Sequence, residues 1–283
     1  MSADQVFHSR SEGIPSEGVK DQYADGKAAR TWNKFIGDSN QRTRIYKDFL
    51  IGLLRKNDCK KVLDTACGTG IDSMMLVDEG FNLVSVDASD KMLKHALKAR
   101  WDKRKNSKYD EWIIEEANWE TLPRDIESFL PGTQFDAVIC LGNSFAHLLD
   151  EFGDNRVQKM CLRNFATCLK PGGLLFIDHR NYDAMIEGGA TPGHSIYYNV
   201  SISMIVLWIR VGILGMPYGL FDCLVAGGTF RLCYFPHKLE KFTKMLDEAF
   251  DNRAKHSIYA DFKPLNEVAV PSFYIHVLEK AAN

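Results

Sequence analysis

The chain has 283 residues, a length that accommodates one α/β domain with an elaboration or two small domains. Its 35 Lys and Arg against 37 Asp and Glu give a net charge of −2, which excludes the strongly basic surface typical of nucleic-acid-binding proteins. Its seven cysteines include no C-x-x-C pair, so no metal site or disulfide framework is predicted, and reduced thiols in a cytosolic protein fit better.

The N-terminal part is predicted to be an extended arm. Residues 1–30 lack apolar periodicity and contain several glycines and a proline. The first residues are polar, and we expect no signal peptide there. From Asn40 to Lys56 apolar residues recur at helical spacing, which predicts a helix that covers the front of a sheet.

Strand-like and helix-like segments then alternate along the chain. Such alternation predicts a parallel sheet with helices on both faces. Ser89 provides a side-chain cap for the helix that follows it, and a late amphipathic helix and a closing strand are predicted near the C-terminal end. The alternating segments are 61–65, 70–79, 82–87, 90–103, 112–116, 135–141, 155–169 and 174–178, and the late helix and strand are 238–250 and 272–278.

The most informative segment is the glycine-rich turn that follows the first predicted strand. The apolar run 62–65 enters a turn with Gly68 and Gly70, where backbone N–H groups can approach a ligand closely. A second apolar run ends in Asp87, 19 positions after Gly68, close to the ~20-residue spacing expected of a ribose-binding carboxylate. This pattern predicts a nucleoside-binding βαβ unit.

The type of nucleoside follows from the residues around that turn. A dinucleotide site requires a third glycine, and Ser73 stands in its place. Asp64, four residues before Gly68, instead gives the D-x-x-x-G-x-G pattern of S-adenosylmethionine methyltransferases. Two later segments agree: a buried strand at 135–141, and a helix end, Pro-Gly-Gly turn and strand at 169–178.

Residues 181–235 do not continue the alternation. The run 200–209 is strongly apolar and 211–226 is nearly so, but a membrane helix needs about 20 mostly apolar residues. Arg210, Pro217 and Asp222 interrupt the run, so a buried or lid-forming insertion is favoured over a membrane span. We therefore expect an arm and entry segment at 1–40, a cofactor-binding core at 41–180, a substrate-site insertion at 181–235 and the rest of the core sheet at 236–283.

Six short runs closely resemble the glycine N-methyltransferase family, over roughly residues 4–198 and 230–283. The resemblance implies a Rossmann-like, seven-stranded α/β methyltransferase sheet with an N-terminal arm and an insertion over the substrate. It also implies a cytoplasmic homotetramer that methylates glycine with S-adenosyl-L-methionine, giving sarcosine, and that is inhibited by 5-methyltetrahydrofolate. The runs are 21–26, 67–70, 86–93, 116–119, 140–148 and 177–183.

Carried over residue by residue, the resemblance implies a cofactor site. Asp87 accepts both ribose hydroxyls, since a carboxylate offers two acceptor oxygens; the alternative is a helix cap. Asn118 and Trp119 receive the adenine, although Trp119 could also be a plain core aromatic. Ala66 and Gly68 lie under the amino-acid part. The other implied residues are Tyr23, Trp32 and Arg42, which close over the cofactor with Arg42 near its carboxylate, and Ala88, Leu141, Asn143, Ser144 and His147.

The implied substrate site centres on Arg180, whose guanidinium fork suits the carboxylate of glycine. Its alternative is an ordinary structural salt bridge. Asn143 and the Gly142 carbonyl are expected to hold the amine, with Tyr198 adding a polar contact and Tyr234 and His147 lining the site. In-line geometry and exclusion of water supply most of the acceleration, so no general base is assigned; His147 as a base is the alternative.

The chain also departs from the family. Phe35 and Phe7 stand where the family carries tyrosines, and residues 199–229 are shorter and more apolar than the family's strand-forming segment. Tyr218 is not equated with the substrate-site tyrosine of that segment. A shifted reading frame, a mis-spliced exon or a divergent paralogue would each explain the block. These departures keep two alternatives: methylation of another small amine such as sarcosine, or S-adenosylmethionine or folate binding without turnover.

Overall fold

The computed structural model of the chain describes residues 42–188 and 234–282, the backbone of three strands between 205 and 233, and six isolated residues. Those six are Tyr23, Gly26, Ala29, Arg30, Ile196 and Tyr197. Within the described residues, no helix is long and apolar enough to cross a membrane.

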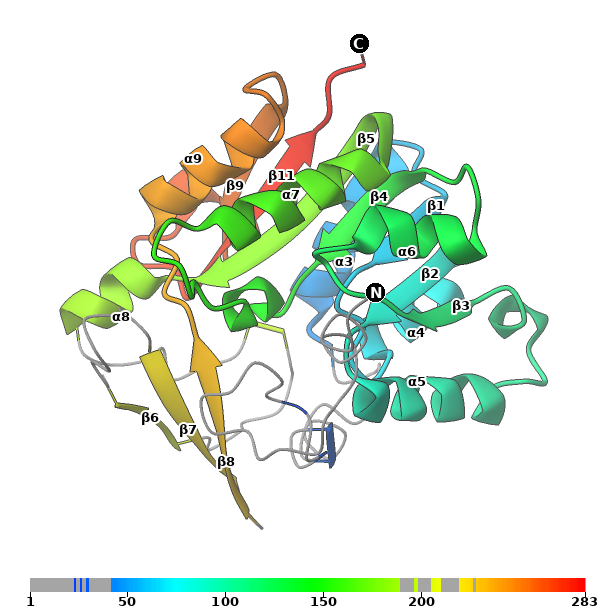
Figure 1. Cartoon of the computed structure of the whole chain (residues 1–283), viewed down its shortest axis with the longest axis horizontal. Helices are drawn as coiled ribbons and strands as arrows, with labels where there is room; N and C mark the ends of the chain where they lie inside the picture. Colours follow the sequence, from blue (N-terminus) through cyan, green and yellow to red (C-terminus); the bar gives the residue numbers. More distant parts are fainter. Residues whose placement is uncertain are drawn as a thin grey trace.

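An eight-stranded sheet in the order β10-β9-β11-β5-β4-β1-β2-β3 forms the centre of the molecule (Figure 1). Five strands from β5 to β3 are parallel, and β11 lies antiparallel between β5 and β9. The strands are β1 Lys61–Asp64, β2 Asn82–Asp87, β3 Ile113–Glu116, β4 Phe135–Cys140, β5 Leu169–Arg180, β9 Lys255–Ala260, β10 Lys263–Pro264 and β11 Phe273–Glu279.

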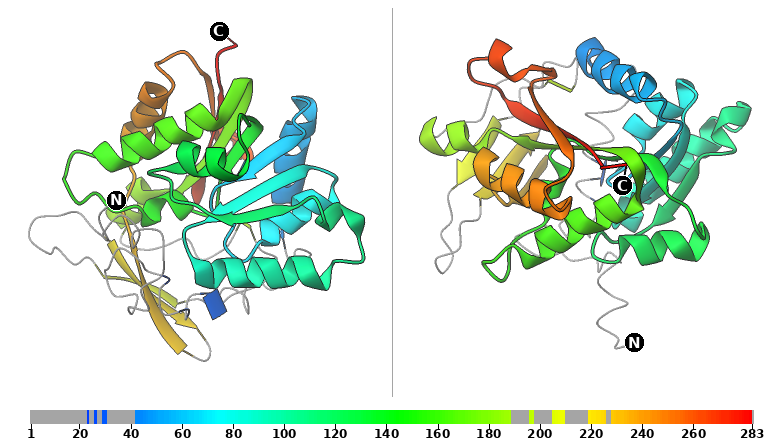
Figure 2. Two further views of the ribbon diagram at one scale, coloured as in Figure 1. Left: turned by 45° about the vertical axis from the view of Figure 1, so that its right-hand side comes forward. Right: turned by 90° about the horizontal axis from the view of Figure 1, so that it is seen from above.

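Two layers of helices cover the opposite faces of this sheet (Figure 2). Each layer buries an apolar cluster against alternate residues of the same strands, such as Val62 on one face and Leu63 on the other. One layer holds α3 Arg44–Lys56, α4 Ile71–Asp78 and α5 Asp90–Asp102, and the other holds α6 Leu122–Phe129, α7 Arg156–Cys168 and α9 Leu239–Ala249. The short helices are η2 Ser107–Tyr109, η3 Ser144–His147, α8 Tyr182–Gly188 and η4 Leu265–Glu267.

Local sequence accounts for the turn between β1 and α4. Gly70 has φ +84°, and an added Cβ would lie 2.8 Å from the Trp112 ring and 3.0 Å from the Ala96 Cβ. Glycine is therefore needed there for packing against α5 and Trp112, a reason that the sequence did not suggest. Gly68 has φ +54°, and an added Cβ there would meet only the Met92 Cε at 4.0 Å, so its ligand-facing role stays a prediction. The predicted cap at Ser89 is confirmed: its hydroxyl accepts from the Met92 N–H.

The predicted alternation is confirmed, with three differences. The sheet has eight strands and not seven, because β9 and the two-residue β10 extend it beyond β11. Helix α6 was not predicted, since its apolar pattern spans only eight residues. β5 begins at Leu169 and not at 174, so it includes the Pro-Gly-Gly turn. The pairing register with β4 shifts between Phe135 and Ala137, and the extra residues of β5 at this bulge include Gly172, which has φ +76°.

Three segments between residues 205 and 234 form a second, three-stranded antiparallel sheet, drawn below the main sheet in Figure 1. It consists of β6 Ile205–Ile209, β7 Gly219–Val225 and β8 Gly228–Tyr234. After β8 the chain returns to the main body, where the Phe235 N–H donates to the Ala146 carbonyl of η3 at 2.7 Å. The insertion therefore rejoins the core beside the loop that follows β4.

Candidate functional site

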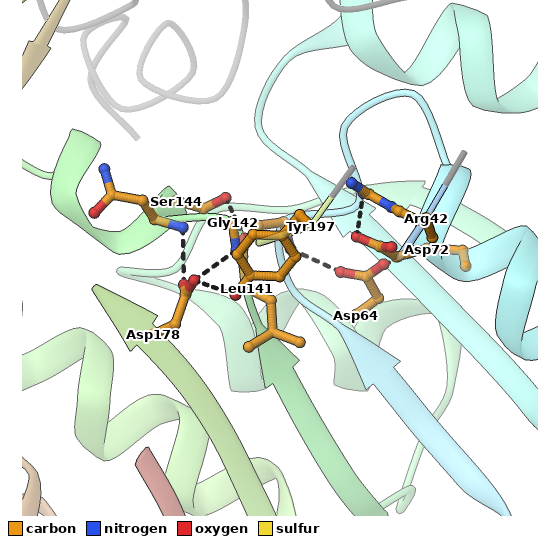
Figure 3. Close-up of polar contacts among 11 residues, drawn as sticks. Arg42, Asp64, Asp72, Leu141, Gly142, Ser144, Asp178 and Tyr197 are labelled. Atoms are coloured by element: carbon orange, nitrogen blue, oxygen red, sulfur yellow. Dashed lines mark hydrogen bonds and ion pairs between the residues drawn. The ribbon is translucent and has the colours of Figure 1, made fainter. Parts of the chain in front are cut away.

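The carboxyl ends of the five parallel strands meet at one edge of the main sheet, and most predicted site residues follow them directly. The strand order reverses at β1, which pairs with β2 on one side and β4 on the other. Ligands of open α/β sheets bind outside the carboxyl ends of the strands at such a reversal. Figure 3 shows polar residues gathered above the ends of these strands.

Asp87 lies at the end of β2 beside the glycine-rich turn. Its Oδ2 accepts from the Gly68 N–H at 2.9 Å, and its Oδ1 accepts from the Ser89 N–H at 2.9 Å. Asp87 and Gly68 are half-buried, and Ala88 between the two acceptor contacts is exposed. Each carboxylate oxygen has a second lone pair that can accept from a ligand hydroxyl. Asp87 thus tethers the two loops and is only half-buried.

A buried polar chain supports the glycine-rich turn from below. The Trp112 indole donates to Ser85 at 2.7 Å, Ser85 donates to Ser73 at 2.8 Å, and Ser73 donates to Asp64 at 2.7 Å. Burial raises the pKa of Asp64 to about 7, although the Ser73 hydrogen bond opposes this rise. Ser73 therefore has a structural role at the place where a dinucleotide site has its third glycine.

The adenine candidates lie after β3. Trp119 is half-buried, stacks on Phe145 with ring centroids 5.6 Å apart, and donates its indole N–H to the Thr65 carbonyl at 2.6 Å. The Asn118 Oδ1 accepts from the Glu120 N–H at 2.9 Å. Trp119 is thus packed in the core and also borders the loop after β1, and its contact with adenine stays a prediction.

Two of the three residues expected to close the site, Arg42 and Tyr23, are among the described residues. The Arg42 guanidinium pairs with Asp72 in the first turn of α4 at 2.6 Å (Figure 3). The Tyr23 hydroxyl lies 3.0 Å from His147 Nε2, and the His147 ring lies 4.5 Å from that of Tyr234. The N-terminal arm, η3 and the end of β8 are therefore joined at these rings.

Asp178, near the end of β5, organises the turn after β4 (Figure 3). It is fully buried, and its carboxylate accepts from the Asn143 N–H at 2.8 Å, from the Gly142 N–H at 3.2 Å and from the Tyr197 hydroxyl. Burial raises the pKa of Asp178 to about 6, while the Tyr197 hydrogen bond acts against this rise. The Ser144 hydroxyl also holds the turn by donating to the Leu141 carbonyl at 2.8 Å.

Asn143 connects this turn to Arg180. It adopts a left-handed conformation with φ +63° and is buried. Its Oδ1 accepts from the Arg180 backbone N–H at 3.1 Å, and its amide group lies 3.0 Å from the Tyr182 hydroxyl. Asn143 therefore fixes the backbone of Arg180. A direct contact between Asn143 and the substrate amine stays a prediction.

Arg180 is held at its backbone while its guanidinium stays near the edge of the sheet. The guanidinium lies over the Phe273 ring, 4.9 Å from the centroid, and the residue is half-buried. Among residues 42–188 and 234–282, no carboxylate forms an ion pair with it. Such a pre-oriented cation can bind the carboxylate of a small ligand in a bidentate manner.

Trp32 and Tyr198 lie outside the described residues, as do Phe7, Phe35 and Tyr218. Sequence reasoning assigned no role to Asp178, Tyr182 or Tyr197. Asp178 could have been found, because it lies two residues before Arg180 at the end of a buried strand. No group of three or more His, Cys, Asp or Glu side chains in the described part of the chain is arranged to hold a metal ion.

Residues 62–173 match a family described as a methyltransferase domain. Glycine N-methyltransferase of Rattus norvegicus is 49% identical to the chain, and the match covers 98% of this chain and 99% of that protein. Glycine/sarcosine N-methyltransferase of Halorhodospira halochloris is 33% identical over 92% of this chain and 89% of that protein. An S-adenosylmethionine-dependent methyltransferase from Clostridium acetobutylicum has the same fold, with a TM-score of 0.64, 17% identity, and 91% of this chain and 99% of that chain covered.

Proposed function

The chain belongs to the glycine N-methyltransferase family, and we propose that it transfers the methyl group of S-adenosylmethionine to the amine of glycine, giving sarcosine and S-adenosylhomocysteine. The match to glycine N-methyltransferases over nearly the whole length of both proteins supports the proposal. The methyltransferase sheet and the carboxylate at the end of β2, hydrogen-bonded to the glycine-rich turn, are consistent with a cofactor site there.

The loops after β1, β2 and β3 are the proposed cofactor side. Asp87 accepts the ribose hydroxyls, Gly68 and Ala66 admit the amino-acid part, and Asn118 and Trp119 border the adenine. The arrangement of Asp87, held by two backbone N–H groups at the end of β2 beside the Gly68 turn, supports its role. The remaining proposed cofactor residues are Tyr23, Trp32, Arg42, Ala88, Leu141, Asn143, Ser144 and His147.

The loops after β4 and β5 are the proposed substrate side. Arg180 binds the glycine carboxylate, and the exposed Gly142 with Asn143 lies beside it where the amine would be held. Tyr234 lies 4.5 Å from the His147 ring at the border of the same edge, and Tyr198 follows Tyr197, whose hydroxyl donates to Asp178. These roles place the amine between the turn after β4 and the cofactor.

The chemistry requires positioning more than covalent participation. S-adenosylmethionine carries its own leaving group, so in-line alignment and exclusion of water supply the acceleration. Only the neutral amine has a free lone pair for attack. The ammonium form of glycine must therefore lose a proton before transfer, and no general base is assigned to this step.

The assembly and regulation are proposed from the family resemblance. We propose a cytoplasmic homotetramer inhibited by 5-methyltetrahydrofolate, with residues 181–235 as the segment that covers the substrate. The β8 connection back to Ala146 supports the last point, because it brings that segment beside η3. We divide the chain at 40, 180 and 235; β5 ends at Arg180 and β8 at Tyr234.

The observation that carries the substrate assignment is Arg180: fixed at its backbone, stacked on Phe273 and without an ion pair in the described part of the chain. Arg180→Lys keeps the charge and removes the planar fork, so kcat/KM for glycine should fall about 10- to 100-fold. S-adenosylmethionine affinity by calorimetry should be unchanged.

The matched control is Arg156→Lys, which alters a surface arginine paired with Asp154 at 2.8 Å. It should leave turnover unchanged. If Arg180→Lys retains wild-type kinetics with glycine, the carboxylate is bound elsewhere and the proposed substrate site is wrong.

A further inference from the structure

On the face of the main sheet covered by α9, four side chains from four elements form one hydrogen-bonded chain. Asp247 of α9 lies 2.7 Å from His256 Nδ1, and His256 Nε2 lies 2.9 Å from His276 Nδ1. His276 Nε2 lies 3.1 Å from His179 Nε2, and His179 Nδ1 lies 2.8 Å from the carbonyl oxygen of Arg180. The chain thus ends on the backbone of the proposed glycine-binding residue.

The inner part of this chain is shielded from water. His179 and His276 are fully buried, and the Phe242 ring packs against both in edge-to-face contacts, 4.9 Å and 5.4 Å between centroids. The outer part reaches the surface, since the side chains of His256 and Asp247 are 10% and 38% exposed. A charge in the chain is therefore best accommodated at its outer end.

The number of protons in the chain follows from its end groups. Four hydrogen bonds link Arg180, three imidazoles and Asp247, and the groups at both ends, a carbonyl and a carboxylate, are acceptors. Each hydrogen bond needs one proton, whereas a neutral imidazole carries one N–H. Three neutral rings supply three protons for four bonds. No choice of tautomers removes this deficit.

We propose that this hydrogen-bonded chain of side chains holds one additional proton, on His256. The same hydrogen-bonded chain positions the Arg180 backbone through His179. The imidazolium ion is a weaker acid than the carboxylic acid of aspartate. The additional proton therefore belongs on His256, and Asp247 keeps its negative charge. His179 then donates to Arg180, His276 donates to His179, and His256 donates to both His276 and Asp247.

The surrounding charges agree with this location. Burial lowers the pKa of His179 to about 4 and that of His276 well below its usual value, so both rings stay neutral. Asp183 raises the pKa of His179 slightly against burial, and His237 lies in the same buried region with a strongly lowered pKa. Lys255 and Glu279, paired at 3.9 Å, are adjacent in sequence to His256 and its cross-strand partner Leu278 and therefore point to the opposite face of the sheet.

Loss of the additional proton at high pH must break one of the four bonds. The effect on glycine rests on the proposed role of Arg180. Because the hydrogen-bonded chain ends on the Arg180 carbonyl, losing one of its bonds should weaken glycine binding and leave cofactor binding unchanged. One lost buried hydrogen bond corresponds to about a five-fold rise in KM for glycine. His179 therefore acts as a positioning residue, through the backbone of Arg180.

The test is NMR of the full-length protein with ¹⁵N-labelled histidine, which reports the protonation of each imidazole nitrogen. At pH 7 the wild type should show one ring with both nitrogens protonated, assigned to His256 by its loss in His256→Gln. In Asp247→Asn the amide can donate to His256 Nδ1, so the chain is complete with three neutral rings and the doubly protonated signal should vanish. Asp251→Asn, an exposed neighbour, should leave the signal unchanged.

The kinetic experiment measures KM for glycine against pH in the wild type and in Asp247→Asn, and compares the two as a ratio at each pH. The KM of the wild type should rise about five-fold as the proton is lost, whereas that of Asp247→Asn should lack this rise. The ratio of variant to wild-type KM should therefore fall about five-fold. Three neutral rings in the wild type, or a doubly protonated ring that persists in Asp247→Asn, would overturn the proton assignment. An unchanged KM on proton loss would overturn the positioning role. Absence of glycine turnover in the wild type would refute the proposed function and leave the NMR result intact.

Discussion

Two aspartates at the ends of β2 and β5 use the same contact for different purposes. Asp87 accepts from the backbone N–H groups of Gly68 and Ser89, and Asp178 accepts from those of Gly142 and Asn143. Asp87 is half-buried, whereas Asp178 is fully buried and also accepts from a tyrosine hydroxyl. The contact to backbone N–H groups fixes a loop in both cases, and burial decides whether the carboxylate can also bind a ligand.

The difference extends to the two halves of the site. The cofactor half, after β1 and β2, relies on backbone N–H groups and a half-buried carboxylate. The substrate half, after β4 and β5, relies on buried side chains whose hydrogen bonds are already filled. We therefore expect substitutions in the substrate half to affect stability and turnover together, and substitutions in the cofactor half to affect binding more selectively.

The largest effect is expected for Asp178→Asn. The amide presents N–H donors toward groups that are themselves donors, so the free energy of unfolding should fall by about 3 kcal/mol. Glycine turnover should fall with it, because the turn that contains Gly142 and Asn143 loses its acceptor. Urea denaturation and steady-state kinetics measure the two quantities.

Asp136→Asn is the matched control for this variant. Asp136 also accepts from two backbone N–H groups, those of Lys60 and Lys61, but at the opposite end of the sheet. It should lower stability without a specific effect on turnover in the folded protein. Equal losses of activity per folded molecule in the two variants would contradict a specific role of Asp178.

Asp87→Ala is expected to weaken S-adenosylmethionine binding by one to two powers of ten, roughly 1.5–3 kcal/mol, because charge-assisted hydrogen bonds to the ribose are lost. Calorimetry on the purified protein measures the dissociation constant. Asp90→Ala, which removes a carboxylate paired with Lys91 and Lys94, should leave that constant unchanged. An unaltered affinity in folded Asp87→Ala would refute the ribose role.

The smallest effect is expected for Tyr197→Phe, which deletes one hydrogen bond to Asp178 and should cost about 1 kcal/mol of stability. The Tyr197 hydroxyl acts to lower the pKa of Asp178, so its removal should raise that pKa above the value of about 6. The ratio of variant to wild-type turnover should therefore fall in acid before either protein unfolds. A ratio that is constant between pH 5 and 8 would contradict this coupling.

The sign of the pH effect differs for stability and activity. The pKa of Asp178 is about 6 in the folded protein, above the ~3.9 of an unfolded aspartate. Its protonated form therefore contributes stability that is fully present below pH ~4 and is lost as the pH rises through about 6. Turnover requires the carboxylate as an acceptor and should change in the opposite direction, falling as the pH falls through about 6.

The frame of the molecule could be predicted because its signals are local. Apolar runs of four to seven residues mark β1, β2 and β4, and the parallel order brings their carboxyl ends to one edge, so Asp87 and the Gly68 turn were expected to lie together. β9 escaped prediction because its residues are mostly half-buried and its alternation is weak.

The buried network could not be predicted, because its partners are distant in the chain. His179 and His276 are 97 positions apart, and Asn143 and Arg180 are 37 apart. No local pattern relates such residues; only the sheet order places them side by side. For the same reason the sequence suggested a cofactor contact for Arg42 and gave no sign of its partner Asp72.

The position of β11 has a consequence for how the protein is made. β11 is not an edge strand: it lies between β5 and β9, and it pairs with β5 from Phe273 to Glu279 and with β9 from Tyr274 to Glu279. During synthesis β5 therefore leaves the ribosome about a hundred residues before its neighbour, with one edge of hydrogen-bonding groups uncovered. An uncovered strand edge is a template for pairing with other chains. We expect the nascent chain to depend on chaperones in this interval, and folding to be limited by the late insertion of a strand so distant in sequence.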